Sequence, residues 1–168
     1  IGETGLDFFY EGFDGERQIR QFKTHITTAL EVKKPLIIHC RDASSSLIPL
    51  LKSENAEQVG GVMHCFVDDW DVALAAMDLG FFISFSGIVT FKNAGKLRLV
   101  AEKMPIEKIL IETDSPWLAP VPERGKQNQP AFVAHTARFL SDLRNESLLD
   151  FSRETTRNFY SLFNLAAK

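Results

Sequence analysis

Pro35-Leu-Ile-Ile-His-Cys-Arg41 is the stretch that decides the fold, because it joins a short apolar run to a histidine, His39. The pattern recurs in Gly61-Val-Met-His-Cys65, which places His64 after a second apolar run. Helical sequence separates the two runs, so each is expected to be a buried strand. A strand-helix repeat of this kind forms a parallel sheet, and ligands bind at the carboxyl ends of its strands.

Two carboxylates stand in equivalent places. Glu3 follows Ile1-Gly2, and Asp114 follows Ile109-Leu-Ile-Glu-Thr. We therefore predict that Glu3, His39, His64 and Asp114 each stand at a strand end and together bind a metal ion. A lone core histidine is more often structural than a ligand, but four such residues in phase with one repeat favour a metal site. Mixed nitrogen and oxygen donors suit zinc, manganese or iron, and tolerate magnesium.

The periodicity of the chain predicts an α/β protein with five strands. Expected strands lie near residues 1–3, 35–40, 60–65, 81–85 and 108–113, and expected helices near 16–32, 43–51, 69–79, 94–103, 130–143 and 147–163. A complete barrel of eight strands needs about 250 residues. We therefore expect residues 1–168 to form a single partial TIM-barrel domain, five strand-helix units of a (β/α)8 barrel whose N-terminal strands are absent. An open five-stranded sheet, complete in itself, is the alternative.

Composition narrows the class of protein. Hydrophobic residues make up 45% and charged residues 24% of the chain, as in ordinary globular domains. Its apolar runs are far shorter than the roughly 18 residues of a membrane span, so we expect a cytoplasmic protein without a membrane partner. The net charge of −3 argues against a broad basic surface for nucleic acid, but it permits a phosphodiester held by metal ions and local cations. Cys40 and Cys65 are expected to be buried, reduced thiols.

Several blocks resemble the TatD family of metal-dependent deoxyribonucleases. They are Ile1-Gly-Glu-Thr-Gly-Leu-Asp-Phe8, Ile38-His-Cys-Arg-Asp-Ala43, Met63-His-Cys-Phe66, Gly87-Ile-Val-Thr-Phe-Lys-Asn93, Ile111-Glu-Thr-Asp-Ser-Pro116, Leu118-Ala-Pro-Val-Pro-Glu-Arg-Gly-Lys-Gln-Asn128 and Thr156-Arg-Asn-Phe-Tyr-Ser-Leu-Phe163. The resemblance covers essentially the whole chain. It implies an amidohydrolase-type barrel with one or two divalent ions, such as magnesium, manganese or zinc, and DNA as the substrate.

The resemblance also implies roles for individual residues. Glu3 matches the family's bridging glutamate, and His39 and His64 match its two histidine ligands. Asp114 matches the aspartate of the last strand, a metal ligand and candidate catalytic base, while Arg41 is expected to meet a phosphate. The family's opening Asp-x-His-x-His-like block has no match here, because the chain begins after it.

Other residues have weaker expectations. Arg124, Lys126 and Asn128 follow the last strand, where barrels often bind phosphate, so they are either substrate contacts or a solvated loop. Trp117 either stacks on a base or packs against the protein. Glu112 is expected to support the metal ligands without binding the ion itself. His25 and His135 are expected to be structural or surface residues. Capping of helices accounts for Asp7, Asp42, Asp68 and Asp69.

The leading hypothesis is therefore a metal-dependent deoxyribonuclease, expected to act from an end or on single strands, with Glu3 and Asp114 as catalytic groups. A metal hydrolase of an ester or amide bond in a nucleotide or aminoacyl substrate is a second reading, because the same chemistry serves those bonds. A third is an inactive fragment. A partial barrel exposes sheet edges, so self-association is also expected.

Overall fold

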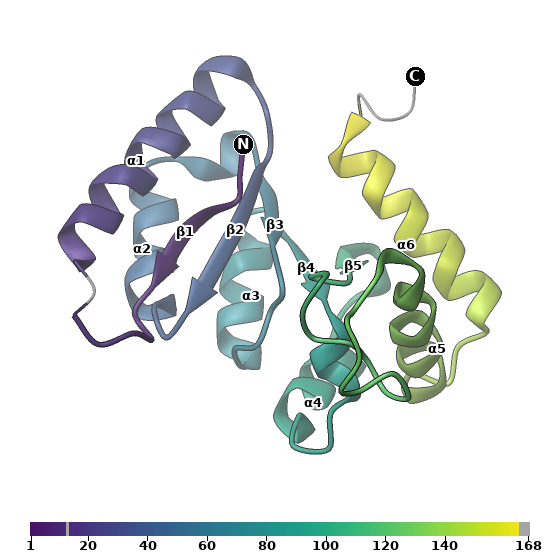
Figure 1. Ribbon diagram of the computed structural model, residues 1–168. Coiled ribbons are helices and arrows are strands. Elements are labelled where there is room, and N and C mark those ends of the chain that lie inside the picture. The colour runs from purple at the N-terminus through teal and green to yellow at the C-terminus, as the bar shows by residue number, and fades with distance from the viewer. Residues whose placement is uncertain (13, 165–168) are drawn as a thin grey trace. The chain divides into compact units, whose positions relative to one another are not determined.

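The computed structural model describes residues 1–12 and 14–164 of the chain (Figure 1). It is an α/β fold with a five-stranded sheet whose strands follow one another in chain order, as the sequence predicts. The strands are β1 (Thr4–Asp7), β2 (Leu36–Arg41), β3 (Gly61–Met63), β4 (Phe82–Phe85) and β5 (Ile109–Ile111). The α-helices are α1 (Gly15–Val32), α2 (Ser44–Ser53), α3 (Trp70–Asp78), α4 (Gly95–Lys103), α5 (Val133–Leu143) and α6 (Leu148–Leu162).

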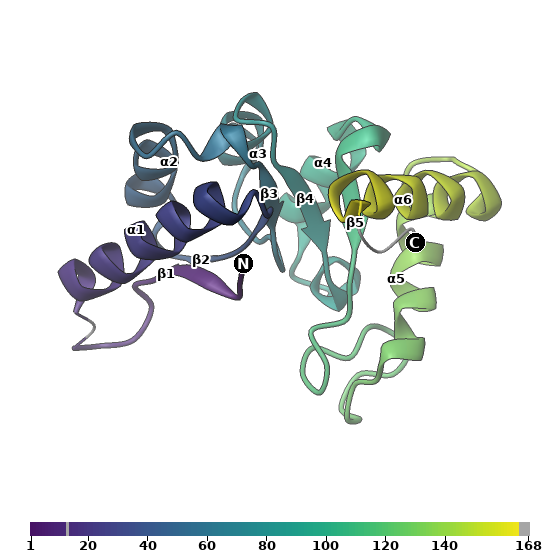
Figure 2. The same cartoon turned by 90° about the horizontal axis from the view of Figure 1, so that it is seen from above.

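The chain divides into two compact units. The first contains Ile1–His64 and Asp71–Ile83, and the second contains Cys65–Trp70 and the chain from Ser84 onward. In the first unit, β1 to β3 and the start of β4 pair in parallel. Helix α1 packs against β1 and α2 against β2, and α1 runs alongside β1 in both views (Figures 1 and 2). In the second unit, α6 packs against α5 and β5.

The side chains of strand β2 alternate between a buried face and a more accessible face. Leu36, Ile38 and Cys40 are buried, whereas Ile37, His39 and Arg41 between them are half-buried. Successive side chains of a strand point to opposite faces, so His39 and Arg41 share the more accessible face. The alternation therefore leaves His39 and Arg41 on the face of the strand that a ligand can reach.

Close backbone packing explains two glycines of the first unit. A Cβ atom on Gly61 would collide with the carbonyl oxygen of Leu36, and one on Gly5 with that of His39. Neither glycine can be replaced without moving β2. Thus the same packing that joins the strands also fixes the backbone of His39.

The structure corrects three expectations of local structure. Strand β1 begins after Glu3, so Glu3 precedes a strand and Asp7 ends it. Helix α2 begins at Ser44 after Ala43, so Asp42 does not cap it; its φ of 52° takes it out of helical geometry. Cys65 is half-buried rather than buried, although both cysteines are free thiols as expected. Among the described residues, no helix is long and apolar enough to cross a membrane.

Candidate metal centre

Three side chains of the first unit form a compact donor cluster. Oε1 of Glu3 lies 3.2 Å from Nδ1 of His39 and 3.5 Å from Nε2 of His64. One ligand atom from each residue lies within 4.8 Å of the other two. Carboxylate and imidazole groups are therefore brought together from segments far apart in the sequence, which is the arrangement that a metal ion requires.

Pairing of the parallel strands brings these three residues to the same place in the sheet. His39 lies in β2, and His64 directly follows β3, where its backbone N–H donates to the Ile38 carbonyl at 2.8 Å. Glu3 reaches the same place from the segment before β1, whose Gly5 is in register with His39. Pairing of neighbouring strands thus sets the spacing of the donors.

The donor set fits a divalent cation in chemistry and access. Two neutral imidazole nitrogens and one carboxylate oxygen are ligands that zinc and manganese share. The side chains of His64, His39 and Glu3 are 16%, 34% and 54% exposed. The histidines are therefore held by the fold, while the carboxylate is reachable from solvent.

Asp7 is a member of this site that the sequence analysis assigns to capping. Its Oδ2 lies 3.2 Å from Nε2 of His39, and its Oδ1 accepts the backbone N–H of Phe9. The side chain of Gln18 bonds both the N–H and the C=O of Asp7, each at 2.8 Å. Asp7 is therefore fixed on both sides and holds the ring of His39 from the nitrogen that does not face Glu3. The register of β1 on β2, in which Gly5 pairs with His39, brings Asp7 there, and no signal in the sequence alone reveals that register.

Asp114 belongs to the second unit. It follows β5 with a φ of 58°, is half-buried, and its carbonyl accepts the N–H of Trp117 at 3.0 Å. Glu112, one residue beyond β5, is half-buried too. Asp114 therefore stands in a tight turn at the carboxyl end of a strand, as expected, and its membership of the metal site stays a prediction.

Arg41 projects from the same strand as His39 but is already engaged. Its guanidinium carbon lies 3.5 Å from the centroid of the Phe9 ring, and Tyr10 packs edge-on against Phe9. Stacking holds the guanidinium by its face, so its N–H groups stay directed sideways toward other partners. Contact with a phosphate by Arg41 stays a prediction.

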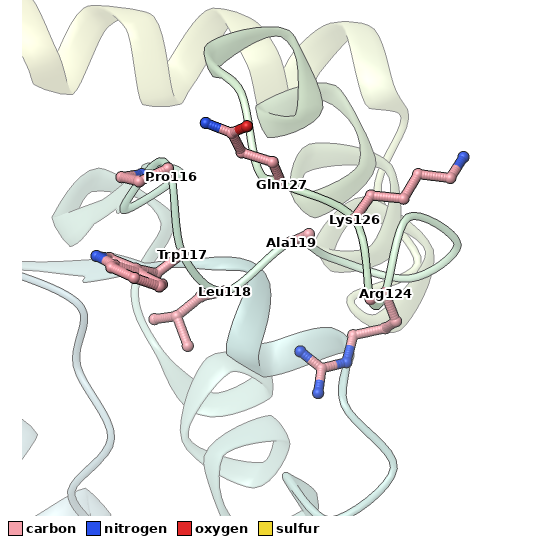
Figure 3. Close-up of a pocket in the computed structure, with 8 residues that line it drawn as sticks. Pro116, Trp117, Leu118, Ala119, Arg124, Lys126 and Gln127 are labelled. Atoms are coloured by element: carbon pink, nitrogen blue, oxygen red, sulfur yellow. The ribbon is translucent and has the colours of Figure 1, made fainter.

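The three expected substrate residues in the loop after β5 have different surroundings, and Figure 3 shows two of them, Arg124 and Lys126. Arg124 is exposed and stacks on Phe91, with 3.7 Å between its guanidinium carbon and the ring centroid. Lys126 is paired with Glu123 at 2.6 Å, and this hydrogen bond holds the pKa of the Glu123 carboxyl below its ordinary value.

Asn128 has a structural task in that loop. It is 3% exposed, and its Nδ2 donates to the carbonyls of Thr113 and Trp117, both at 2.6 Å. Its Oδ1 accepts the backbone N–H of Gln129. The side chain is therefore fully used in closing the loop, which does not support the expectation that it touches substrate.

Comparison with known proteins identifies the family of this chain. Residues 1–164 match the family model described as TatD related DNase. The chain belongs to this family. The resemblance that the sequence motifs indicate is thereby confirmed. The five-stranded fold corresponds to part of the barrel seen in TatD-type structures.

Relatives within the TatD family carry metal-dependent hydrolase names. The uncharacterized metal-dependent hydrolase YcfH of Escherichia coli K12 is 46% identical over 167 residues, which are 99% of this chain and 63% of the relative. The 3'-5' ssDNA/RNA exonuclease TatD of Erwinia tasmaniensis is 32% identical, over 98% of this chain and 66% of its own length. This chain thus spans about 63% of the length of the first of these relatives.

A solved TatD structure superposes closely on this chain. The crystal structure of YJJV, a TatD homolog from Escherichia coli K12, matches with a TM-score of 0.92 and 31% identity, covering 97% of this chain and 62% of that protein. The hydrolase and metal-dependent character expected from the motifs therefore agrees with both the family and its named members. The identity of the metal stays open to proposal.

Proposed function

We propose that the protein is a metal-dependent hydrolase that cleaves phosphodiester bonds of DNA, acting from a strand end. The observation that carries the proposal is the position of the Glu3 carboxylate within 3.5 Å of imidazole nitrogens of both His39 and His64. The name of one TatD relative as a 3'-5' ssDNA/RNA exonuclease supports a nucleic acid substrate. We propose magnesium, manganese or zinc as the one or two ions.

Each residue of the site has a defined task. His39 offers Nδ1, His64 offers Nε2 and Glu3 offers a carboxylate oxygen to the ion, and Asp114 adds a second carboxylate. A bound divalent ion supplies positive charge to the phosphate and makes water acidic near neutral pH. Asp114 would serve as the base for the attacking water, because a carboxylate within hydrogen-bond reach of a water can take its proton. Glu3 supplies negative charge that holds the cation.

Cationic side chains hold the substrate by its phosphates. Arg41 and Arg124 are the stronger candidates, because each guanidinium rests on an aromatic ring rather than on a carboxylate. Lys126 contributes less, since Glu123 balances its charge. Asn128 acts through the loop that it closes.

The two units serve one hydrolase domain in this proposal. Within the described chain, β1 and β5 stand at the two ends of the strand order, so each pairs on one side only. We propose that a sheet edge mediates self-association, which mass measurement over a range of protein concentrations tests. Two free thiols favour a cytoplasmic location.

Incubation of the full-length protein with magnesium or manganese and end-labelled single-stranded DNA tests the function. Stepwise shortening of the DNA that chelator abolishes is the expected result. Loss of that activity in the double variant His39→Ala/His64→Ala, with His135→Ala as a control, links it to the donor cluster. Metal-dependent cleavage of small esters or amides with intact DNA would replace the nuclease with the second type of hydrolase.

A further inference from the structure

A pocket of about 450 Å³ lies in the loop after β5 (Figure 3). Two segments of that loop line it, namely Pro116–Ala119 and Arg124–Gln127. Its volume is within the usual range of small-molecule sites, about 300–1,000 Å³. The pocket begins two residues after Asp114, whose carbonyl accepts the N–H of Trp117. It is therefore built on the turn that carries a proposed catalytic group.

The walls of this pocket are fixed before any ligand arrives. Asn128 is buried, directly follows the second segment and donates to the Trp117 carbonyl of the first, which ties the two segments together. Gly87 approaches the Leu118 carbonyl so closely that a Cβ atom there would collide with it, and Thr90 bonds the N–H of Val121 at 2.9 Å. A preformed pocket avoids the entropy loss of ordering a loop on binding.

The chemistry of the pocket is that of a nucleotide site. Trp117 presents an indole that is 71% exposed, although burial of such a ring would stabilise the fold. Arg124 is stacked on Phe91 and has no carboxylate within ion-pair distance among the described residues. Figure 3 shows Trp117 and Arg124 coming from the two opposite segments of the lining. An aromatic face and a cation in the lining of one pocket suit a base and its phosphate.

We propose that this pocket binds one unpaired nucleotide of a single strand, with the base stacked on Trp117 and a phosphate on Arg124. The inference rests on the proposed function, and it names the residues that make single strands the preferred substrate. A base inside a duplex has no free face for the indole. Every base can stack on an indole, so the pocket would favour single strands over duplex without preferring any base sequence.

Binding to the full-length protein in chelator, where no hydrolysis occurs, tests this pocket by itself. The probe is a labelled oligothymidylate at low salt, compared with an abasic oligonucleotide of equal length. Trp117→Ala is expected to weaken oligothymidylate binding about tenfold, as for loss of one stacked base, and Trp117→Phe to restore most of it. The abasic probe should bind Trp117→Ala and the parent protein equally. Tyr160→Ala, an exposed aromatic on α6, is the control and should change nothing.

A second measurement isolates the phosphate contact. Arg124→Ala should reduce the slope of log affinity against log salt by about one, whereas Arg153→Ala, an exposed arginine on α6, should leave it unchanged. In a Trp70→Phe background, oligothymidylate should quench the emission of Trp117. Equal effects of Trp117→Ala on both probes, no quenching, or equal affinity for blunt duplex would overturn the proposal. These binding results do not depend on hydrolysis. Binding through Trp117 without any cleavage of DNA would refute the proposed nuclease function alone. Cleavage of DNA together with unchanged binding by Trp117→Ala would refute the proposed nucleotide pocket alone.

Discussion

The carboxylate of Asp7 lies 3.2 Å from Nε2 of His39, at the ring nitrogen opposite the one that faces Glu3. With a metal ion on Nδ1, the ring proton would sit on Nε2, where the Asp7 carboxylate can accept it. A carboxylate behind a histidine also fixes the orientation of its ring. Asp7 therefore holds the ring of His39, and its support of a metal site is a prediction that can be tested.

Asp7→Asn is expected to lower metal affinity by about 10- to 100-fold, the usual effect of removing such a partner. The amide can still accept the N–H of Phe9, so the loop should survive. Calorimetric titration of the metal-free protein with zinc or manganese measures the change, and NMR of the His39 ring nitrogens reports the tautomer. Asp78→Asn, exposed at the end of α3, is the matched control. An unchanged affinity and an unchanged tautomer would remove Asp7 from the site.

Metal removal should destabilise the first unit through the donor cluster. A ligand that binds only the folded state at about 100 times its Kd adds about 2.7 kcal/mol to stability. We expect manganese or zinc to raise the Tm of the parent protein and chelator to reverse the rise. Glu3→Gln and His39→Ala/His64→Ala should abolish most of it, and His135→Ala should keep it. A full rise in the double variant would place the ion elsewhere.

Asp114→Asn tests the proposed base. Loss of a positioned proton acceptor lowers rates by about 10²- to 10⁴-fold, so we expect kcat for DNA hydrolysis to fall by at least about 100-fold. Circular dichroism should remain that of the parent, because the substitution keeps the shape of a half-buried side chain. A kcat within a few-fold of the parent would assign the proton to another group.

Asn128→Ala should destabilise the second unit by about 1–3 kcal/mol, because it leaves buried carbonyl groups without their donor. Urea denaturation measures the loss. Gln129→Ala removes an exposed side chain of the same loop and should shift stability by less than about 0.5 kcal/mol. Equal midpoints for the two variants would show that the loop closes without Asn128.

The ion pair of Glu123 and Lys126 predicts a pH dependence. The Lys126 hydrogen bond lowers the pKa of Glu123 in the folded protein below the ordinary 4.5. The folded state therefore binds a proton less readily than the unfolded state, and the pair adds stability above pH 4.5 that is lost as pH falls through the lowered pKa. The Tm difference between the parent and Glu123→Gln should be positive at neutral pH, small because the Lys126 side chain is exposed to solvent, and absent in acid. A difference that grows in acid would contradict this sign.

Much of the fold follows from sequence because its signals are local. Asp14 caps α1 by accepting the N–H of Arg17, and Ser147 caps α6 in the same way with Asp150. The apolar runs before His39 and His64 indicate strands whose alternation is visible residue by residue. The boundary at Glu3 is wrong in the sequence analysis because three residues are too few to show a period, and pairing with β2 decides where β1 begins.

The sequence by itself determined the order of strands and helices and the TatD motifs, and it predicted that Glu3, His39 and His64 lie together, as they do in the structure. Only the tertiary structure decided which groups these donors meet. Asp7 faces His39, Asn128 faces backbone carbonyls and Lys126 faces Glu123, although all three look alike in sequence as polar residues beside a strand or in a loop. The physical reason is that periodicity fixes the face of a side chain, whereas its partner across strands depends on register and on the path of the loop in space.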